Sequence, residues 1–174
     1  MLSKEDLVDL LMKDTEAFNE TTENMSADLS ETDFSNCTIE GAVFNDADLT
    51  SSSFADSQLT DVKFNGCDLT SVDFTRAKLV ECTFTDSVLN GADFSYATVS
   101  YCNFPESDLA GAIIMEADLT DSDFSTSENL CASRFDDTTI WPDNDKLPDD
   151  FDSSYSDDLS SLKDEEDDFG SADY

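Results

Sequence analysis

The chain has 174 residues, enough for one compact domain with tails, and its 42 acidic residues against 8 basic ones give a formal net charge of −34. This charge excludes direct binding of DNA or RNA and adhesion to an anionic membrane, because both surfaces carry phosphates that would repel the chain. The sequence contains no histidine, so it lacks the commonest general base and the commonest zinc ligand, and we expect no cofactor. No apolar run approaches the roughly 18 residues of a membrane span, and no signal peptide is recognisable, so we expect a cytoplasmic protein.

The first segment, residues 1–26, is predicted to cover one end of the fold. Ser3 and, three residues later, Asp6 form a capping-box pattern that favours the start of a helix. Apolar residues then recur at helical spacing, at Leu7, Leu10, Leu11 and Phe18. We therefore expect one amphipathic helix over residues 3–18, followed by a polar connector over residues 19–26.

A repeat of five residues runs through residues 27–126. The centre of every quintet is large and apolar, and a small or β-branched residue stands two places before it. The ten odd-numbered quintets centre on an aliphatic residue, and nine of the ten even-numbered ones centre on Phe, with Ile114 as the exception. A period of five fits neither an α-helix nor a simple strand. It indicates a coil with flat sides, each of which contributes one large and one small inward residue.

Several quintets carry a resemblance to a known family. Residues 27–31, 47–51 and 117–121 read ADLSE, ADLTS and ADLTD, and they resemble the A(D/N)LXX motif of the pentapeptide-repeat family. The resemblance implies an all-β solenoid: a right-handed quadrilateral β-helix with four quintets per coil and five coils over residues 27–126. Residues twenty apart would then stack, with Phe ladders on two opposite sides and aliphatic ladders on the other two.

The repeat becomes irregular in residues 127–142, after a one-residue slip at residues 125–128. Leu130, Phe135 and Ile140 resume the five-residue spacing, which predicts an imperfect sixth coil. We expect Trp141-Pro142 to end it, because proline cannot donate to a β ladder.

Residues 143–174 contain thirteen acidic residues and two lysines, and this composition predicts a disordered tail. Pro148, Phe151 and Tyr155 are the residues that could fold back on the last coil. Three roles stay open for the tail: a solvated segment that aids solubility, a mimic of nucleic acid, and a segment that holds a basic protein.

Two outward sets of aspartates form the first candidate site for a partner. The first set is Asp28, Asp48, Asp68 and Asp108, and the second is Asp33, Asp73 and Asp93. Like charges stacked at strand spacing are locally unfavourable, so a functional benefit is worth considering. The pentapeptide-repeat family includes Qnr- and MfpA-type proteins, and resemblance to these implies a DNA mimic whose carboxylates face DNA gyrase or another basic, DNA-binding protein. Two alternatives stay open: the aspartates belong to the repeat consensus, or they give a structural module a salt-adapted surface.

An apolar patch forms the second candidate site. Ile113 and Met115 occupy outward positions that are polar in other coils, and Tyr96 lies on the preceding coil, with Tyr101 near the adjoining corner. Outward apolar residues gathered in this way are typical of a protein contact. The alternative is that the tail or the insertion at residues 125–128 shields them.

The cysteines and the predicted interior bear on chemistry. Cys37, Cys67, Cys82 and Cys102 occupy the small inward position, where a thiol serves as a small hydrophobe, although a metal or redox role is the alternative. Cys131 lies outside the repeat and is the one we expect to react. An interior filled by Phe and Leu leaves no cavity for catalysis. We therefore predict a non-enzymatic scaffold for protein–protein interaction, either a monomer or an end-to-end dimer, with an unidentified protein as its partner.

Overall fold

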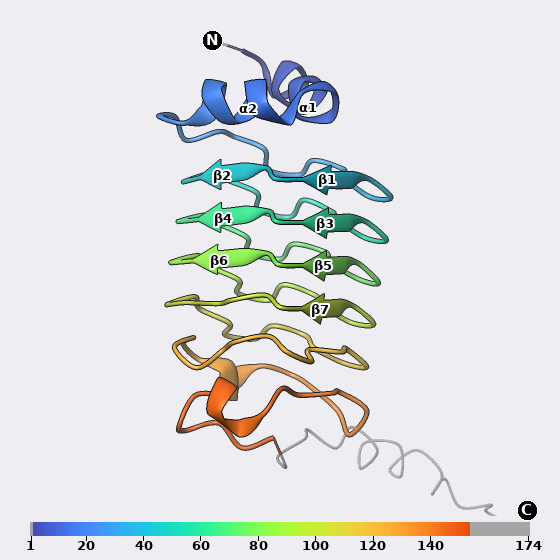
Figure 1. The fold of residues 1–174 in the computed structure, drawn as a ribbon, viewed down its shortest axis with the longest axis vertical. Coiled ribbons are helices and arrows are strands. Elements are labelled where there is room, and N and C mark those ends of the chain that lie inside the picture. The colour runs from blue at the N-terminus through green and yellow to red at the C-terminus, as the bar shows by residue number, and fades with distance from the viewer. Residues whose placement is uncertain (1, 154–174) are drawn as a thin grey trace, which may run out of the picture.

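The computed structural model describes residues 2–153, which form a β-solenoid with two helices at its N-terminal end (Figure 1). Two parallel sheets lie side by side along it. The first sheet has the order β1-β3-β5-β7, made of Thr38–Glu40, Gln58–Thr60, Lys78–Val80 and Thr98–Ser100. The second has the order β2-β4-β6, made of Val43–Asn45, Lys63–Asn65 and Thr83–Thr85.

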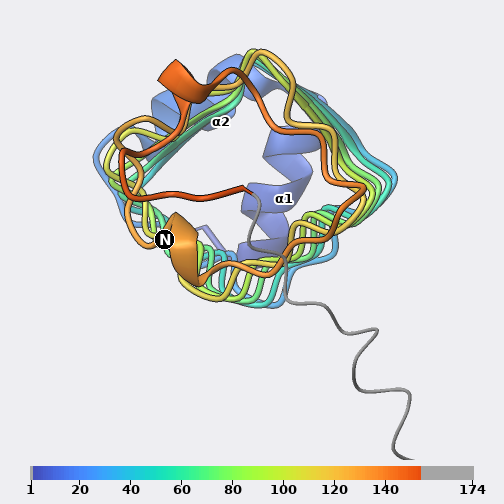
Figure 2. The ribbon, with the colours of Figure 1, turned by 90° about the horizontal axis from the view of Figure 1, so that it is seen from below.

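The strand register sets the length of one turn. Ile39 pairs with Leu59, and Phe44 pairs with Phe64, so each strand pairs with the chain twenty residues further on. The strands of the first sheet span about three turns, and isolated parallel bridges continue the same pairing on the other sides. Viewed along its axis, the solenoid has a four-cornered outline (Figure 2). Twenty residues per turn therefore place four quintets around the axis.

Two ladders of phenylalanines fill the axis, as the repeat pattern predicts. Phe54 and Phe74 stack with their ring centroids 5.3 Å apart, and Phe64 and Phe84 stack at 4.8 Å. Rings of opposite ladders meet edge to face, as Phe74 and Phe84 do at 6.0 Å. The aliphatic centres, such as Leu69, are equally buried. The prediction that the quintet centres point inward is confirmed for the described repeat.

The corners of the solenoid require an unusual backbone. The last residue of nearly every quintet adopts a left-handed conformation, with φ between 48° and 68°. Gly41, Gly66, Gly91 and Gly111 occupy such corners without steric penalty. Side chains at the remaining corners are polar or aromatic, and the flat sides on either side of each corner fix this conformation.

Two helices, rather than the single predicted helix over residues 3–18, cover the N-terminal end. Helix α1 spans Lys4–Lys13 and helix α2 spans Thr15–Thr22. Asp14 separates them because its backbone is not helical, with φ −157° and ψ 89°, and its Oδ1 accepts a hydrogen bond from the Ala17 N–H at 3.0 Å, which starts the second helix. The prediction of one helix followed by a connector from residue 19 is therefore wrong.

The helices supply hydrogen-bond partners for part of the open backbone edge of the first turn. The Asn19 amide donates to the Gly41 carbonyl at 2.9 Å, and its oxygen accepts from the Val43 N–H at 2.8 Å, so this side chain replaces the missing neighbouring strand. Lys4 donates to the Ser30 carbonyl at 2.6 Å. Phe18 is fully buried and meets Phe44 edge to face at 5.5 Å, which continues the Phe ladder into the cap.

The irregular turn after the repeat differs from its prediction in register. Asp108 still pairs with Glu128 at twenty residues, but Ile113 pairs with Arg134 and Asp118 with Ile140. One extra residue therefore enters between residues 128 and 134, where a 3₁₀ helix spans Leu130–Ala132, and a second enters between residues 134 and 140. The sequence, by contrast, predicts a single insertion at residues 125–128. The second insertion turns Ile140 outward, with 53% of its surface exposed, so its prediction as an inward centre is wrong.

Residues 143–153 pack on the last turn, whereas the sequence predicts a disordered tail from residue 143. A 3₁₀ helix spans Asn144–Lys146, and the Phe124 N–H donates to the Lys146 carbonyl at 2.8 Å. Three rings close the end of the core: Phe151 lies 4.6 Å from Trp141 and 5.5 Å from Phe135. The expectation that Phe151 could fold back on the last coil is confirmed, whereas the disorder predicted from composition is wrong for residues 143–153. Tyr155 and the rest of the predicted tail lie outside the described residues.

Candidate interaction surface

The structure places the seven predicted aspartates on two adjacent sides of the solenoid. We name these the Asp28 side (Asp28, Asp48, Asp68, Val88 and Asp108) and the Asp33 side (Asp33, Ser53, Asp73, Asp93 and Ile113), and parallel bridges join each set in this order. Neither ladder is continuous, because Val88 interrupts the first and Ser53 the second. The charges are therefore grouped as Asp28-Asp48-Asp68 and Asp73-Asp93, with Asp33 and Asp108 set apart.

Each of these aspartates has a role in the backbone that sequence reasoning missed. Its Oδ1 accepts a hydrogen bond from the N–H two residues further on, at 2.8–3.1 Å in all seven cases, as Asp68 does from Thr70. This is an Asx turn, and it makes the Asp28 and Asp33 sides run as turns rather than strands. The serine or threonine that usually follows two residues later was the available signal. Aspartate is thus explained at these positions without any partner.

Acidic charge is distributed unevenly around the solenoid. The outward positions of the two strand sheets contain a single acid, Glu40, together with Lys63 and Lys78. Acids gather instead on the two aspartate sides and at the left-handed corners, such as Asp86 and Glu106. The described solenoid therefore presents two nearly neutral flat sides and two acidic ones.

Two aspartates at the first turn have lowered pKa values. Hydrogen bonds from Ser30, together with Lys4, lower the pKa of Asp28 to about 2. Hydrogen bonds from Ser35 lower the pKa of Asp33. Lys4 also makes an ion pair with Asp28 at 3.0 Å, so one charge of this ladder is balanced by the N-terminal cap.

The predicted apolar patch is brought together on successive turns of the Asp33 side. The Tyr96 N–H donates to the Met115 carbonyl at 2.9 Å, and Tyr96 stands at a corner with 54% of its surface exposed. Ile113 and Met115 are half-buried, and the chain at Arg134 pairs beside Ile113. A hydrogen bond to Glu116 raises the pKa of the Tyr96 hydroxyl. The following chain thus covers part of Ile113 and leaves Tyr96 open.

Buried thiols line the interior beside the ladders. Cys67, Cys82 and Cys102 are fully buried, Cys37 is half-buried and Cys131 is exposed, and all five are free. Burial raises the pKa of the Cys67 thiol to about 12, and a hydrogen bond with Cys82 together with burial raises that of Cys102. These protonated thiols pack as small hydrophobes.

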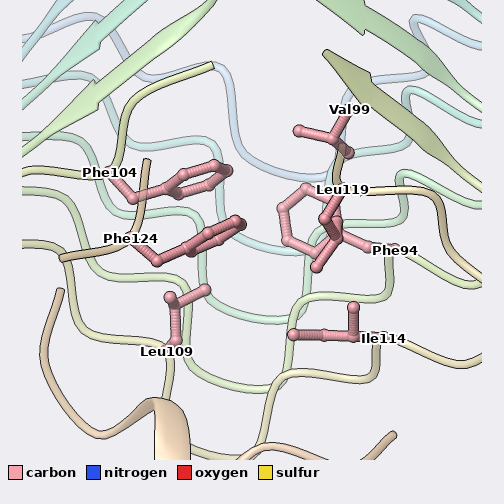
Figure 3. A pocket seen from close by; sticks show the side chains of 7 residues that line it. All are labelled: Phe94, Val99, Phe104, Leu109, Ile114, Leu119 and Phe124. Atoms are coloured by element: carbon pink, nitrogen blue, oxygen red, sulfur yellow. The ribbon is translucent and has the colours of Figure 1, made fainter. Parts of the chain in front are cut away.

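A small cavity lies in the core near its C-terminal end (Figure 3). Its volume is about 10 Å³, and its lining is apolar, with Phe94, Phe104 and Phe124 among the contributors. It forms where Ile114 takes the place of the next stacked phenylalanine after Phe94. Such a space is at the lower limit for one water molecule and offers no polar partner.

The described residues 2–153 contain neither a metal-binding cluster nor a membrane-spanning helix. Within this range, no group of three or more His, Cys, Asp or Glu side chains could hold a metal ion. No helix among the same residues is long and apolar enough to cross a membrane.

Comparison with known proteins identifies the repeat. Residues 57–135 match a family model described as a pentapeptide repeat region, and residues 27–66 match a second described as pentapeptide repeats in eight copies. Together these matches cover more than half of the chain. No curated protein matches it.

Solved structures of similar fold include a pentapeptide repeat protein from the thylakoid lumen of Arabidopsis thaliana, with 29% identity, a TM-score of 0.37, and coverage of 60% of this chain and 70% of that one. QnrB1, a plasmid-mediated fluoroquinolone resistance protein, is 16% identical with a TM-score of 0.34 and coverage of 64% and 87%. HetL from Nostoc sp. strain PCC 7120, involved in heterocyst differentiation regulation, is 19% identical with a TM-score of 0.31 and coverage of 67% and 63%.

Proposed function

Because the chain belongs to the pentapeptide-repeat family, we propose that it is a non-enzymatic scaffold whose outer surface recognises a protein partner. The interior is occupied by packed rings and aliphatic side chains, so recognition falls to the sides and corners. A rigid solenoid suits this role, because its side chains are held at fixed spacing before a partner arrives.

The proposal also covers the handedness and the number of coils: a right-handed solenoid of five complete coils and an irregular sixth. The continuation of bridges from Asp28 through Asp123 supports the number of coils. Right-handedness rests on the general rule that crossovers between parallel strands of one sheet are right-handed in roughly 98% of cases.

The observation that carries the proposal is the apolar patch of Tyr96, Ile113 and Met115 on the Asp33 side. Tyrosine is among the residues enriched at the centres of protein interfaces. Tyr96 is exposed and lies beside the partly exposed Ile113 and Met115, so the three side chains offer an uncharged contact area. In other turns the positions of Ile113 and Met115 are taken by polar or small residues, such as Asp93 and Ser95. The patch is therefore local to one end of the solenoid.

A second candidate function is mimicry of nucleic acid by the acidic sides. Asp28, Asp48 and Asp68 follow one another on successive turns, and this run favours a basic or DNA-binding partner. Each Asx turn uses one carboxylate oxygen, so the negative charge remains available to such a partner.

Capture of partners with matched variants tests both candidates. The immobilised full chain is compared with an Ile113→Thr/Met115→Gln variant and with an Asp48→Asn/Asp68→Asn variant, in which asparagine still accepts the turn hydrogen bond. Binding is measured at about 50 mM and about 500 mM salt, because screening weakens contacts between exposed charges. We expect a partner that survives high salt and is lost only with the first variant. A partner lost at high salt and with the second variant would instead support mimicry.

A further inference from the structure

A hollow of about 230 Å³ lies at the C-terminal end, at a different corner from the apolar patch. The residues that line it include the aromatic residues Tyr101 and Trp141, Pro142, and the acidic residues Asp121 and Asp143. Small-molecule sites usually occupy roughly 300–1,000 Å³, so this hollow suits a single side chain rather than a whole ligand.

The fold brings these residues together on three successive turns. Thr98 pairs with Asp118, which places Tyr101 and Asp121 at the same corner of neighbouring turns. Asp118 pairs in turn with Ile140, so Trp141 and the residues after it run along the next turn. The two aromatic side chains therefore stand on either side of the turn that carries Asp121.

Both aromatic residues are held in place but keep surface for a ligand. Trp141 packs edge to face on Phe135 at 5.1 Å, which anchors one part of the indole while another lines the hollow. Tyr101 is 59% exposed, so most of its side chain is open to a ligand. Tyr96, at a corner of the same turn, differs in that interaction with Glu116 raises the pKa of its hydroxyl.

The charge of the hollow is negative. Within residues 2–153, neither Asp121 nor Asp143 makes an ion pair. Lys146 also lines the hollow, but its ammonium group is paired with Asp123 at 2.9 Å, and this hydrogen bond raises the pKa of Lys146. Asp121 and Asp143, which make no ion pair within residues 2–153, thus lie near Tyr101 and Trp141 in a site that favours a cation.

We propose that this hollow binds an arginine side chain presented by a protein partner. A planar guanidinium stacks on tyrosine or tryptophan and pairs with carboxylates through its fork of N–H donors, and both kinds of group line the hollow. The partner is accordingly a protein with an exposed arginine. This inference rests on the proposed scaffold function and adds to it a second contact, separate from Ile113 and Met115.

Trp141 provides the readout, because it is the only tryptophan in the chain. The indole N–H signal of the ¹⁵N-labelled full chain is followed by NMR during titration with N-acetyl-arginine methylamide. The citrulline analogue, which has nearly the same shape without the charge, and the lysine analogue serve as ligand controls. Tyr101→Ala tests the site, and Tyr96→Ala is the matched control at an equally left-handed corner of the same turn.

We expect the arginine compound to shift the indole signal saturably and the citrulline compound to leave it in place. Tyr101→Ala should weaken binding about two- to fivefold, the factor expected for one exposed cation–π contact, while Tyr96→Ala leaves it unchanged. An unmoved indole signal, an equal response to citrulline or lysine, or equal weakening by both tyrosine variants would overturn the proposal. The titration uses no partner protein, so it can fail while the scaffold function stands, and the reverse also holds.

Discussion

Removal of the Phe74 ring tests whether the Phe ladders hold the solenoid together. Phe74 is fully buried in the middle of the stack. Its ring stacks on Phe54 at 5.3 Å and on Phe94 at 4.9 Å, and it meets Phe64 and Phe84 edge to face at 6.3 and 6.0 Å. Phe74→Ala thus removes one ring from four ring pairs at once.

The expected loss of stability is large because the cavity cannot collapse. Phe→Ala in a core lowers the free energy of unfolding by about 3–5 kcal/mol, and more where the neighbours cannot move inward. The Phe74 N–H donates to the Asp93 carbonyl at 2.7 Å, and the Asp73 N–H to the Ser52 carbonyl at 3.0 Å, so the backbone is held from both neighbouring turns. We therefore expect about 4–5 kcal/mol for Phe74→Ala, and about 1–2 kcal/mol for Phe74→Leu, which keeps most of the volume.

Equilibrium unfolding in urea measures this loss. Circular dichroism follows the whole chain, and Trp141 fluorescence follows the C-terminal end, so agreement between the two midpoints checks that the solenoid unfolds as one unit. A loss below about 1 kcal/mol for Phe74→Ala, with an unchanged dependence on urea, would contradict the structure of the core.

Four further predictions concern the rest of the chain. Ile114→Phe should fill the core cavity and raise the unfolding free energy by about 0.5–2 kcal/mol in the same urea assay, whereas a decrease would indicate overpacking. Asp68→Ala should lower it by about 1 kcal/mol through loss of the Asx turn while Asp68→Asn changes it little, and equal effects of the two would argue against the turn. In thermal unfolding, Phe151→Ala should lower the melting temperature and deletion of residues 156–174 should leave it unchanged, so the opposite ranking would refute the closing role of Phe151. The carboxylate of Asp28 has a lowered pKa in the folded state, so its stabilisation is complete above about pH 4 and is lost as the pH falls towards 2. Asp28→Asn should reduce the fall in melting temperature over that interval, and an unaltered pH dependence would count against the contacts of Asp28 with Ser30 and Lys4.

The repeat could be predicted from sequence because every coil has the same packing pattern. A large residue at each quintet centre and a small one two places before it permit only an inward ladder, and the period of ten assigns phenylalanine to alternate sides. Ile114, the one break in the alternation, coincides with the cavity in the core. The local pattern therefore predicted a flat-sided coil with inward ladders, and the resemblance to the pentapeptide-repeat family supplied the solenoid fold class.

The ends were less predictable because non-periodic contacts determine them. Asp14 ends one helix and starts another through its own side chain, a choice that the apolar spacing from Leu7 to Phe18 does not reveal. Beyond residue 128, two inserted residues shift the register, and Phe151 closes the core from within an acidic segment. Composition cannot distinguish such a closing segment from a solvated tail.

The candidate site was predictable in placement but not in chemistry. Register alone put Tyr96 beside Met115 and aligned the aspartates. The Asx turns needed backbone geometry, and the hollow beside Trp141 depends on an irregular turn that no repeat rule describes. Sequence reasoning consequently identified the sides of the solenoid and missed the hollow.

The central claim, that side chains of the Asp33 side recognise a protein partner, is tested most directly by affinity. The dissociation constant of a captured partner is measured by calorimetry for the wild type, for Ile113→Thr/Met115→Gln and for Asp48→Asn/Asp68→Asn, at low and high salt. The account predicts at least about tenfold weaker binding for the first variant, equal to about 1.4 kcal/mol, with little change for the second and weak dependence on salt. Unchanged affinity for the first variant, together with a loss for the second that grows at low salt, would contradict it.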